Sequence, residues 1–187
     1  MKKFLLIGTI AFMGTALLTS CGQAGKKAAP EAEFNYEVDR FEDISVLKYR
    51  LPAFEQLTSG EKEFIYYLSE AALCGRDILW DQNFKYNMLI RKTIEAIIDT
   101  YDGDRESTDY KAFITYAKRV FFANGIHHHY SNDKFVPGFS ADYFAGLVSG
   151  SDAARLPLKE GQTAGDLTAM LTPVLFDPAL YARRVDQ

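Results

Sequence analysis

Apolar residues recur at helical intervals over most of the chain beyond residue 58, and this spacing predicts a mostly helical protein. Thr58 and Glu61 have the spacing of a capping box, and Asn124–Gly125 is typical of a helix C-terminus. In the first predicted helix, the apolar positions from Phe64 to Leu79 indicate an inner face. The predicted helices cover residues 58–82, 84–101, 107–123, 140–148 and 163–176.

Residues 34–52 have a different pattern, in which apolar and polar residues partly alternate. The alternating apolar residues are Phe34, Tyr36, Val38, Ile44 and Val46. Such alternation favours extended structure over helix. The predicted fold class is therefore mostly α, with a short extended N-terminal segment.

The first 20 residues have the pattern of a bacterial lipoprotein signal peptide. Two lysines precede the apolar run Phe4–Leu18, which is shorter than a comfortable membrane span. The sequence Leu-Thr-Ser-Cys that ends at Cys21 matches a lipobox, in which the cysteine thiol becomes a thioether to diacylglycerol. An ordinary signal peptide cut near Ser20 and a short membrane anchor are the alternatives.

The lipobox predicts three consequences for the chain. Residues 1–20 would be removed, Cys21 would carry the lipid, and residues 21–33 would form a flexible tether of small and polar residues. The protein would be anchored by lipid in the bacterial cell envelope, facing the periplasm or the cell surface. The protein would therefore contact the membrane through this lipid anchor.

Charge and cysteine content exclude some functions. The net charge of −4 gives no reason to expect nucleic acid as a partner. Only two cysteines occur, so lipidation of Cys21 would leave Cys74 without a disulfide partner within the chain. The apolar helical pattern around Cys74 favours a buried, inert thiol over a reactive one.

The three histidines are adjacent, at His127, His128 and His129. A zinc site needs three or four ligands that converge at roughly 2 Å, and adjacent side chains diverge on a strand or a helix. The sequence contains no HExxH-type spacing, no nucleophile with an oriented base and no glycine-rich phosphate loop. From residues alone we expect no catalytic residue and no metal ligand, and a loop, pocket, core or solvated role for the histidines.

Two long segments carry a family resemblance. The segments YYLSEAALCGRDILWDQNFKYNMLIRKTIEAI and YAKRVFFANGIHHHYSNDKFVPGFS resemble the N-terminal part of bacterial dipeptidyl peptidase III. That family consists of zinc exopeptidases that release dipeptides from the N-terminus of oligopeptides. The resemblance implies two lobes around a cleft, with zinc held in the upper lobe by a HExxGH motif and a later glutamate. The motif's own glutamate activates the zinc-bound water.

The HExxGH motif is absent from this sequence. The resemblance therefore implies that residues 34–187 are an incomplete N-terminal region of the mixed α+β lower lobe, without the zinc-binding lobe. No catalytic or metal residue is carried over, and the chain alone is expected to bind no zinc and to be inactive. It is also expected to expose apolar surface and to be poorly soluble or loosely packed.

The segment His128–Lys134 matches a lower-lobe loop that faces the cleft in the family. The resemblance thus implies that His128, His129, Tyr130 and Ser131 contact the peptide substrate. Two alternatives remain open: a non-enzymatic peptide-binding surface lipoprotein, and an independent metal-binding lipoprotein that uses the histidine tract.

Overall fold

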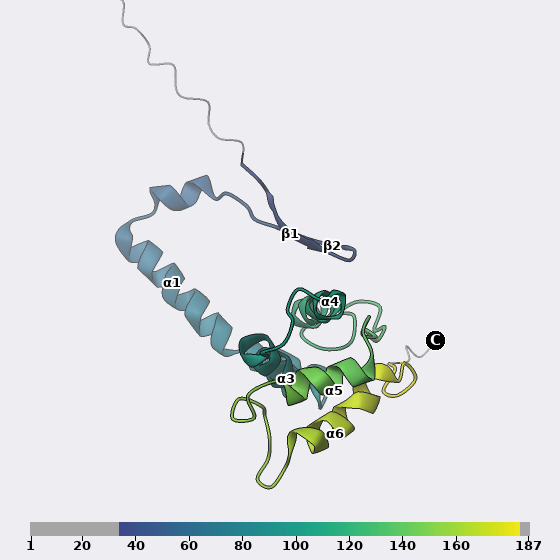
Figure 1. Ribbon diagram of the computed structural model, residues 1–187. Helices are drawn as coiled ribbons and strands as arrows, with labels where there is room; N and C mark the ends of the chain where they lie inside the picture. Colours follow the sequence, from purple (N-terminus) through teal and green to yellow (C-terminus); the bar gives the residue numbers. More distant parts are fainter. Residues whose placement is uncertain (1–33, 184–187) are drawn as a thin grey trace, which may run out of the picture. The chain divides into compact units, whose positions relative to one another are not determined.

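The computed structural model describes residues 34–183 (Figure 1). The expected signal peptide, Cys21 and the tether of residues 21–33 lie outside the described residues. The chain divides into two units by its contacts, Met1–Asn35 and Tyr36–Gln187. The architecture below is that of the second unit.

The described elements confirm a mostly helical fold after a short extended segment. In chain order they are β1 (Glu37–Phe41), β2 (Ile44–Leu47), the 3-10 helix η1 (Pro52–Gln56), α1 (Ser59–Cys74), α2 (Arg76–Asn83), α3 (Asn87–Thr100), α4 (Thr108–Ala123), α5 (Ala141–Ser149) and α6 (Ala164–Phe176).

The extended segment is a two-stranded antiparallel hairpin. Phe41 pairs with Ile44 across a tight turn, and the register is irregular between Glu37 and Asp39. The half-buried face of β1 carries Glu37, Asp39 and Phe41. Asp39 accepts a hydrogen bond of 2.6 Å from the Lys118 ammonium of α4, so an ion pair joins the hairpin to that helix.

The predicted helix over residues 58–82 is wrong in one respect, because it is two helices. Thr58 and Glu61 form the predicted capping box at the start of α1. The helix then ends at Cys74, and α2 begins at Arg76 after Gly75. Glycine is a poor helix former because ordering its backbone costs the most conformational entropy, so a break at Gly75 is the least costly place for one.

The inner face expected for this helix is not buried, and no residue of α1 is buried among those described. Leu68, for example, is 53% exposed. Cys74 is exposed as well, so the prediction of a buried thiol is wrong. Helical spacing places apolar residues on one face, but it does not show that another element covers that face. The exposed apolar residues of α1 and α2 are Phe64, Ile65, Tyr66, Tyr67, Leu68, Leu73, Ile78 and Leu79.

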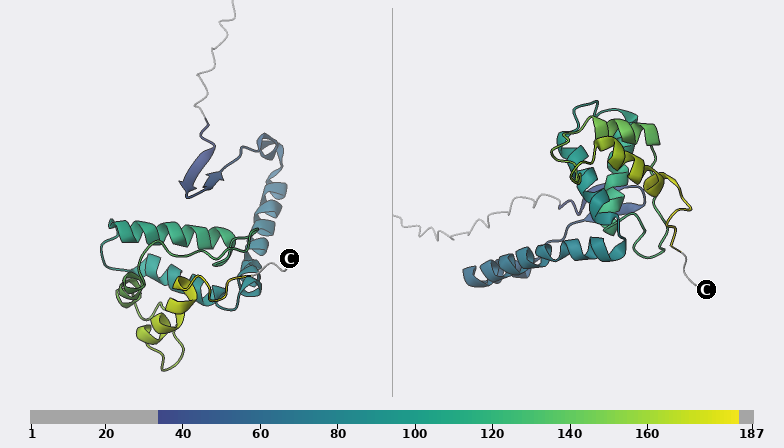
Figure 2. Two further views of the ribbon diagram at one scale, coloured as in Figure 1. Left: turned by 90° about the vertical axis from the view of Figure 1, so that its right-hand side faces the viewer. Right: turned by 90° about the horizontal axis from the view of Figure 1, so that it is seen from below.

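The hydrophobic core is built from α3, α4, α5 and α6, and α5 lies beside α6 (Figures 1 and 2). Helical spacing places Met88, Ile90, Ile94 and Ile97 or Ile98 on the inner side of α3; Ile90, Ile94 and Ile97 are buried, whereas Met88 and Ile98 are only partly buried. Trp80 of α2 joins this core and makes an edge-on contact with Phe121 of α4. Each fully buried aliphatic or aromatic side chain contributes about 1.5–3 kcal/mol from burial.

The starts of these helices follow the sequence closely. Ser107, the first residue of the helix expected over residues 107–123, caps α4 by accepting a hydrogen bond from the Tyr110 amide. Thr163 and Asp166 form a second capping box at the start of α6. Between residues 34 and 183, no helix combines the length and the apolar character needed to cross a membrane.

Candidate functional site

The histidines lie in a loop that starts where α4 ends. Asn124 takes the left-handed conformation (φ 53°), and Gly125 follows with φ 151°. A Cβ at Gly125 would lie 2.1 Å from the Asn87 Nδ2 atom, so only glycine fits this position. The Asn-Gly pair therefore ends the helix, as predicted, and also lets α3 approach the loop.

Asn87 of α3 fixes the first residues of the loop. Its Nδ2 donates to the Asn124 carbonyl oxygen at 3.3 Å, and its Oδ1 accepts from the Ile126 amide at 3.3 Å. The Asn87 side chain is buried, so these bonds satisfy groups that water cannot reach. The loop therefore leaves α4 in a direction that α3 sets.

The loop itself is a short hairpin closed by backbone hydrogen bonds. The Phe135 amide donates to the Ile126 carbonyl at 2.8 Å, and the His128 amide donates to the Asp133 carbonyl at 2.7 Å. His127 and Lys134 form an isolated antiparallel bridge between these bonds. This hairpin presents residues 128–132 as a tight turn.

His128 holds the turn together through its own ring. Its Nδ1 accepts hydrogen bonds from the Tyr130 and Ser131 amides at 3.1 and 3.0 Å. An imidazole nitrogen that accepts in this way carries no proton, so the proton of the neutral ring is on Nε2. Ser131 donates to the Asp133 carboxylate at 2.6 Å and is also engaged within the turn.

His127 is the buried member of the tract, at 5% exposure. Its Nε2 lies 2.8 Å from the Tyr181 carbonyl oxygen. Because a carbonyl only accepts, Nε2 carries the proton and Nδ1 is left as an acceptor, buried and without a partner. Burial lowers the pKa of His127, and the charges of Arg183 and Lys134 lower it further. The ring is therefore neutral at neutral pH.

The four residues expected to contact peptide lie together on this turn. The His128 and His129 rings stack with centroids 4.6 Å apart, and the Tyr130 ring lies 4.2 Å from that of His129. Tyr130 is 84% exposed, whereas His128 is half-buried. The turn therefore offers an exposed aromatic surface with a rigid base. Whether peptide binds there stays a prediction.

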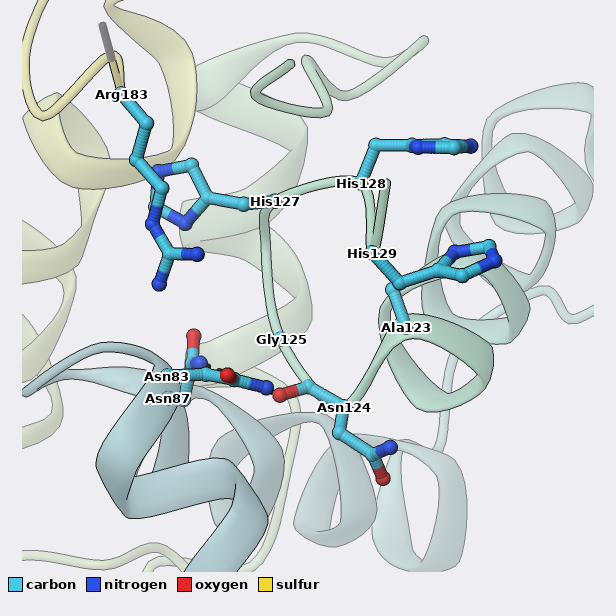
Figure 3. Close-up of a pocket in the computed structure, with 9 residues that line it drawn as sticks. All are labelled: Asn83, Asn87, Ala123, Asn124, Gly125, His127, His128, His129 and Arg183. Carbon is cyan, nitrogen blue, oxygen red and sulfur yellow. Dashed lines mark hydrogen bonds between the residues drawn. The ribbon is translucent and has the colours of Figure 1, made fainter. Parts of the chain in front are cut away.

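A pocket of about 80 Å³ lies beside the turn (Figure 3). In Figure 3 the His127 ring points toward Arg183, while His128 and His129 point to the other side of the loop. Sequence patterns marked Asn124–Gly125 only as a helix end, and no pattern pointed to Asn83 of α2 or Asn87 of α3. The lining residues are Asn83, Asn87, Ala123, Asn124, Gly125, His127, His128, His129 and Arg183.

The histidine tract does not fit zinc. In His127, Nδ1 is buried and Nε2 donates a hydrogen bond to a carbonyl oxygen. In His128, Nδ1 already accepts hydrogen bonds from two backbone amides. The nitrogens left to bind a metal belong to the two stacked rings of His128 and His129, and two rings cannot supply three ligands around one point. Within residues 34–183, no group of three or more histidine, cysteine, aspartate or glutamate residues could hold a metal ion.

The described residues therefore form a mostly helical segment in which an exposed histidine turn lies beside a small polar pocket. Comparisons with known proteins then point to one family. Dipeptidyl peptidase 3 of Mus musculus is 28% identical in an alignment 137 residues long, which covers 66% of this chain and 19% of the mouse protein. Dipeptidyl peptidase 3 of Homo sapiens is 27% identical with the same coverage.

The chain thus spans about a fifth of the length of these curated relatives. No known family model matches it. The similarity is distant and partial, and it supports a relationship to dipeptidyl peptidase 3.

Proposed function

We propose that this chain is the N-terminal, lower-lobe part of a zinc-dependent dipeptidyl peptidase that releases dipeptides from the N-terminus of oligopeptides. The observation that carries the proposal is the similarity to two dipeptidyl peptidase 3 proteins over 66% of this chain. Because the histidine tract does not fit zinc, the catalytic metal would be held by polypeptide outside this chain. The chain by itself would bind no zinc and cleave no peptide.

In that enzyme, the turn of residues 128–131 would form part of the peptide-binding wall. The hydrogen bonds from the turn to His128 Nδ1 hold the ring in place before any ligand arrives. His129 and Tyr130 present aromatic faces to solvent, and such faces pack against peptide side chains with little loss of side-chain entropy. Their role would be to bind and orient peptide.

The experiment compares His129→Ala and Tyr130→Ala in the intact enzyme. We expect a higher KM for peptides, an unchanged kcat and unchanged stoichiometric zinc, because both side chains would act in binding alone. Tyr49→Ala is the matched control, since Tyr49 is an exposed tyrosine outside the loop and should leave KM unchanged. Loss of bound zinc from either loop variant would contradict the proposed role.

We also propose that the protein is attached to the bacterial cell envelope through lipid on Cys21. The support is the sequence pattern that ends at that cysteine. A Cys21→Ser variant should lose lipid labelling and leave the membrane fraction. If the Cys21→Ser variant stays in the membrane fraction and does not dissolve in detergent-free buffer, the membrane anchor lies elsewhere in the protein.

A further inference from the structure

A second pocket, of about 420 Å³, is lined by α3, by the two residues that precede α3, by the segment before α6 and by α6 itself. None of its lining residues lines the pocket beside the histidine turn. Its volume is within the range of about 300–1,000 Å³ that is usual for small-molecule sites. The pocket is therefore large enough to hold a small organic ligand.

The apolar part of the lining comes from three different parts of the chain. Met88 and Leu89 belong to α3, Met170 belongs to α6, and Pro157 lies in the segment before α6. All four residues are half-buried, so part of each side chain stays accessible. Methionine is unbranched and flexible, and two methionines in one lining adapt to a ligand of irregular shape. This surface suits an aliphatic group.

The charge in the lining is entirely positive. Lys85, Lys92 and Lys159 line the pocket, and no acidic residue does. All three lysines are exposed, and none forms an ion pair with a carboxylate among the described residues. A lysine ammonium is a compact charge on a flexible stem, so three of them can turn toward one anion. The pocket therefore favours a ligand with a negatively charged head.

Two of these lysines are held by contacts within the chain. The Lys159 amide donates to Gln162 Oε1 at 3.1 Å, and the Gln162 amide donates to the Lys159 carbonyl at 2.9 Å, which closes a turn. Lys85 Nζ lies 4.9 Å from the centre of the Tyr86 ring and 5.0 Å from that of Tyr181. The edges of the pocket are thus formed without a ligand.

The hydrogen-bonding groups of the lining argue against a peptide. Lysine ammonium groups only donate, and the side-chain acceptors in the lining are Gln162 Oε1 and the Tyr86 hydroxyl. Gln162 Oε1 already accepts from the Lys159 amide. The amide N–H groups of a bound peptide would find few side-chain acceptors, and a donor left unpaired on binding is costly. An aliphatic acid has an accepting head and no amide donors.

We propose that this pocket binds a single-chain aliphatic carboxylate of medium length, free in solution. The chain would cover Met88, Leu89 and Met170, and the carboxylate would lie among the three lysine ammonium groups. A volume of about 420 Å³ suits one chain and not a two-chain phospholipid. The proposal does not rest on the peptidase function proposed above.

The test follows the methionine methyl signals by NMR in the full chain, labelled at those methyl groups. The chain has four methionines, of which Met88 and Met170 line the pocket and the other two are Met1 and Met13. Octanoate should shift the Met88 and Met170 signals saturably. From butyrate to octanoate, the Kd should fall by up to about fourfold for each methylene group that is buried. Octanol, which has the same chain without the charge, should bind more weakly.

Substitution of the lysines tests the role of charge. Lys92→Gln should raise the Kd for octanoate about two- to fivefold, and Lys159→Gln added to it should raise the Kd again, because exposed charge pairs contribute modestly. Both side chains are exposed, so the fold should be kept. Lys111→Gln is the matched control, since Lys111 is an exposed lysine of α4 that does not line this pocket. It removes the same charge and should leave the Kd unchanged.

Several results would overturn the proposal. The first is an octanoate titration that leaves the Met88 and Met170 signals unmoved, even if other signals shift. Others are octanol binding as tightly as octanoate, or an unchanged Kd in the variant with both lysines substituted. Tighter binding of an N-acetylated leucine dipeptide would replace the aliphatic acid by a peptide. Binding to vesicles of anionic phospholipid without binding of octanoate would replace it by a membrane surface.

Discussion

Truncating a core residue and an α1 residue of similar size should have very different effects on stability. Ile97 of α3 has an exposed fraction of 0%, and Leu68 of α1 is 53% exposed. Ile97→Ala removes buried methyl groups and leaves a cavity, at a cost of about 2–5 kcal/mol in the free energy of unfolding. Leu68→Ala should change that free energy by no more than about 0.5 kcal/mol, as expected for a surface site.

The assay is denaturation by guanidinium chloride, followed by the fluorescence of Trp80 and by circular dichroism. Trp80 is the single tryptophan and is buried in the same core, so its emission reports the unfolding of α3–α6. Ile97→Ala should move the midpoint to clearly lower denaturant at unchanged slope. If Leu68→Ala and Ile97→Ala lower the free energy of unfolding by equal amounts, the conclusion that α1 contributes nothing to the core is refuted.

Three further predictions rest on single positions. Because the pKa of His127 is lowered in the folded chain, the unfolded chain takes up a proton first as the pH falls, and the free energy of unfolding should decrease below pH 6.5. In unfolding curves measured over a pH series, His127→Gln, which keeps a donor near Tyr181, should reduce this decrease. Gly125→Ala should destabilise the chain by about 1–3 kcal/mol in thermal melts, because Gly125 has a positive φ and a Cβ there would clash with Asn87. The control Gly146→Ala lies in α5 with open space around it and should stabilise the chain slightly. Exposed Cys74 should react with a thiol reagent in the native chain without denaturant, as measured by absorbance, and a thiol that reacts only after unfolding would contradict its exposure.

Much of the fold follows from short-range signals in the sequence. The cap at Ser107 and the Asn124–Gly125 stop set the ends of α4, because they act through hydrogen bonds and backbone angles within a few residues. The apolar spacing of α3 likewise gave its buried residues, Ile90, Ile94 and Ile97. These features depend on neighbours along the chain, and neighbours along the chain are visible in a sequence.

The features that the sequence did not give depend on what lies across the fold. The apolar face of α1 has the same spacing as that of α3, yet it stays exposed because no described element covers it. For the same reason the position of Cys74 was predicted wrongly. The exposed face agrees with the expected apolar surface, and the poor solubility or loose packing expected of the isolated chain stays a prediction.

The candidate site was predicted only in part. The tract of His127–His129 was visible at once, but their separation into a buried ring, a ring that holds the turn and an exposed ring was not. Asn87 gave no signal, since an asparagine within a helix has no pattern that marks a contact to a loop 37 residues later. Long-range hydrogen bonds of this kind follow from tertiary packing alone.

We propose above that this chain is part of a zinc dipeptidyl peptidase, and the genomic sequence beyond codon 187, read in all three frames, tests this most directly. We expect a HExxGH motif downstream, in the same frame or in a frame reached by one shift. The complete product should then bind zinc and release dipeptides from oligopeptides. A downstream sequence without that motif in any frame would contradict the account, and oligopeptide binding by the chain itself would become the function to measure.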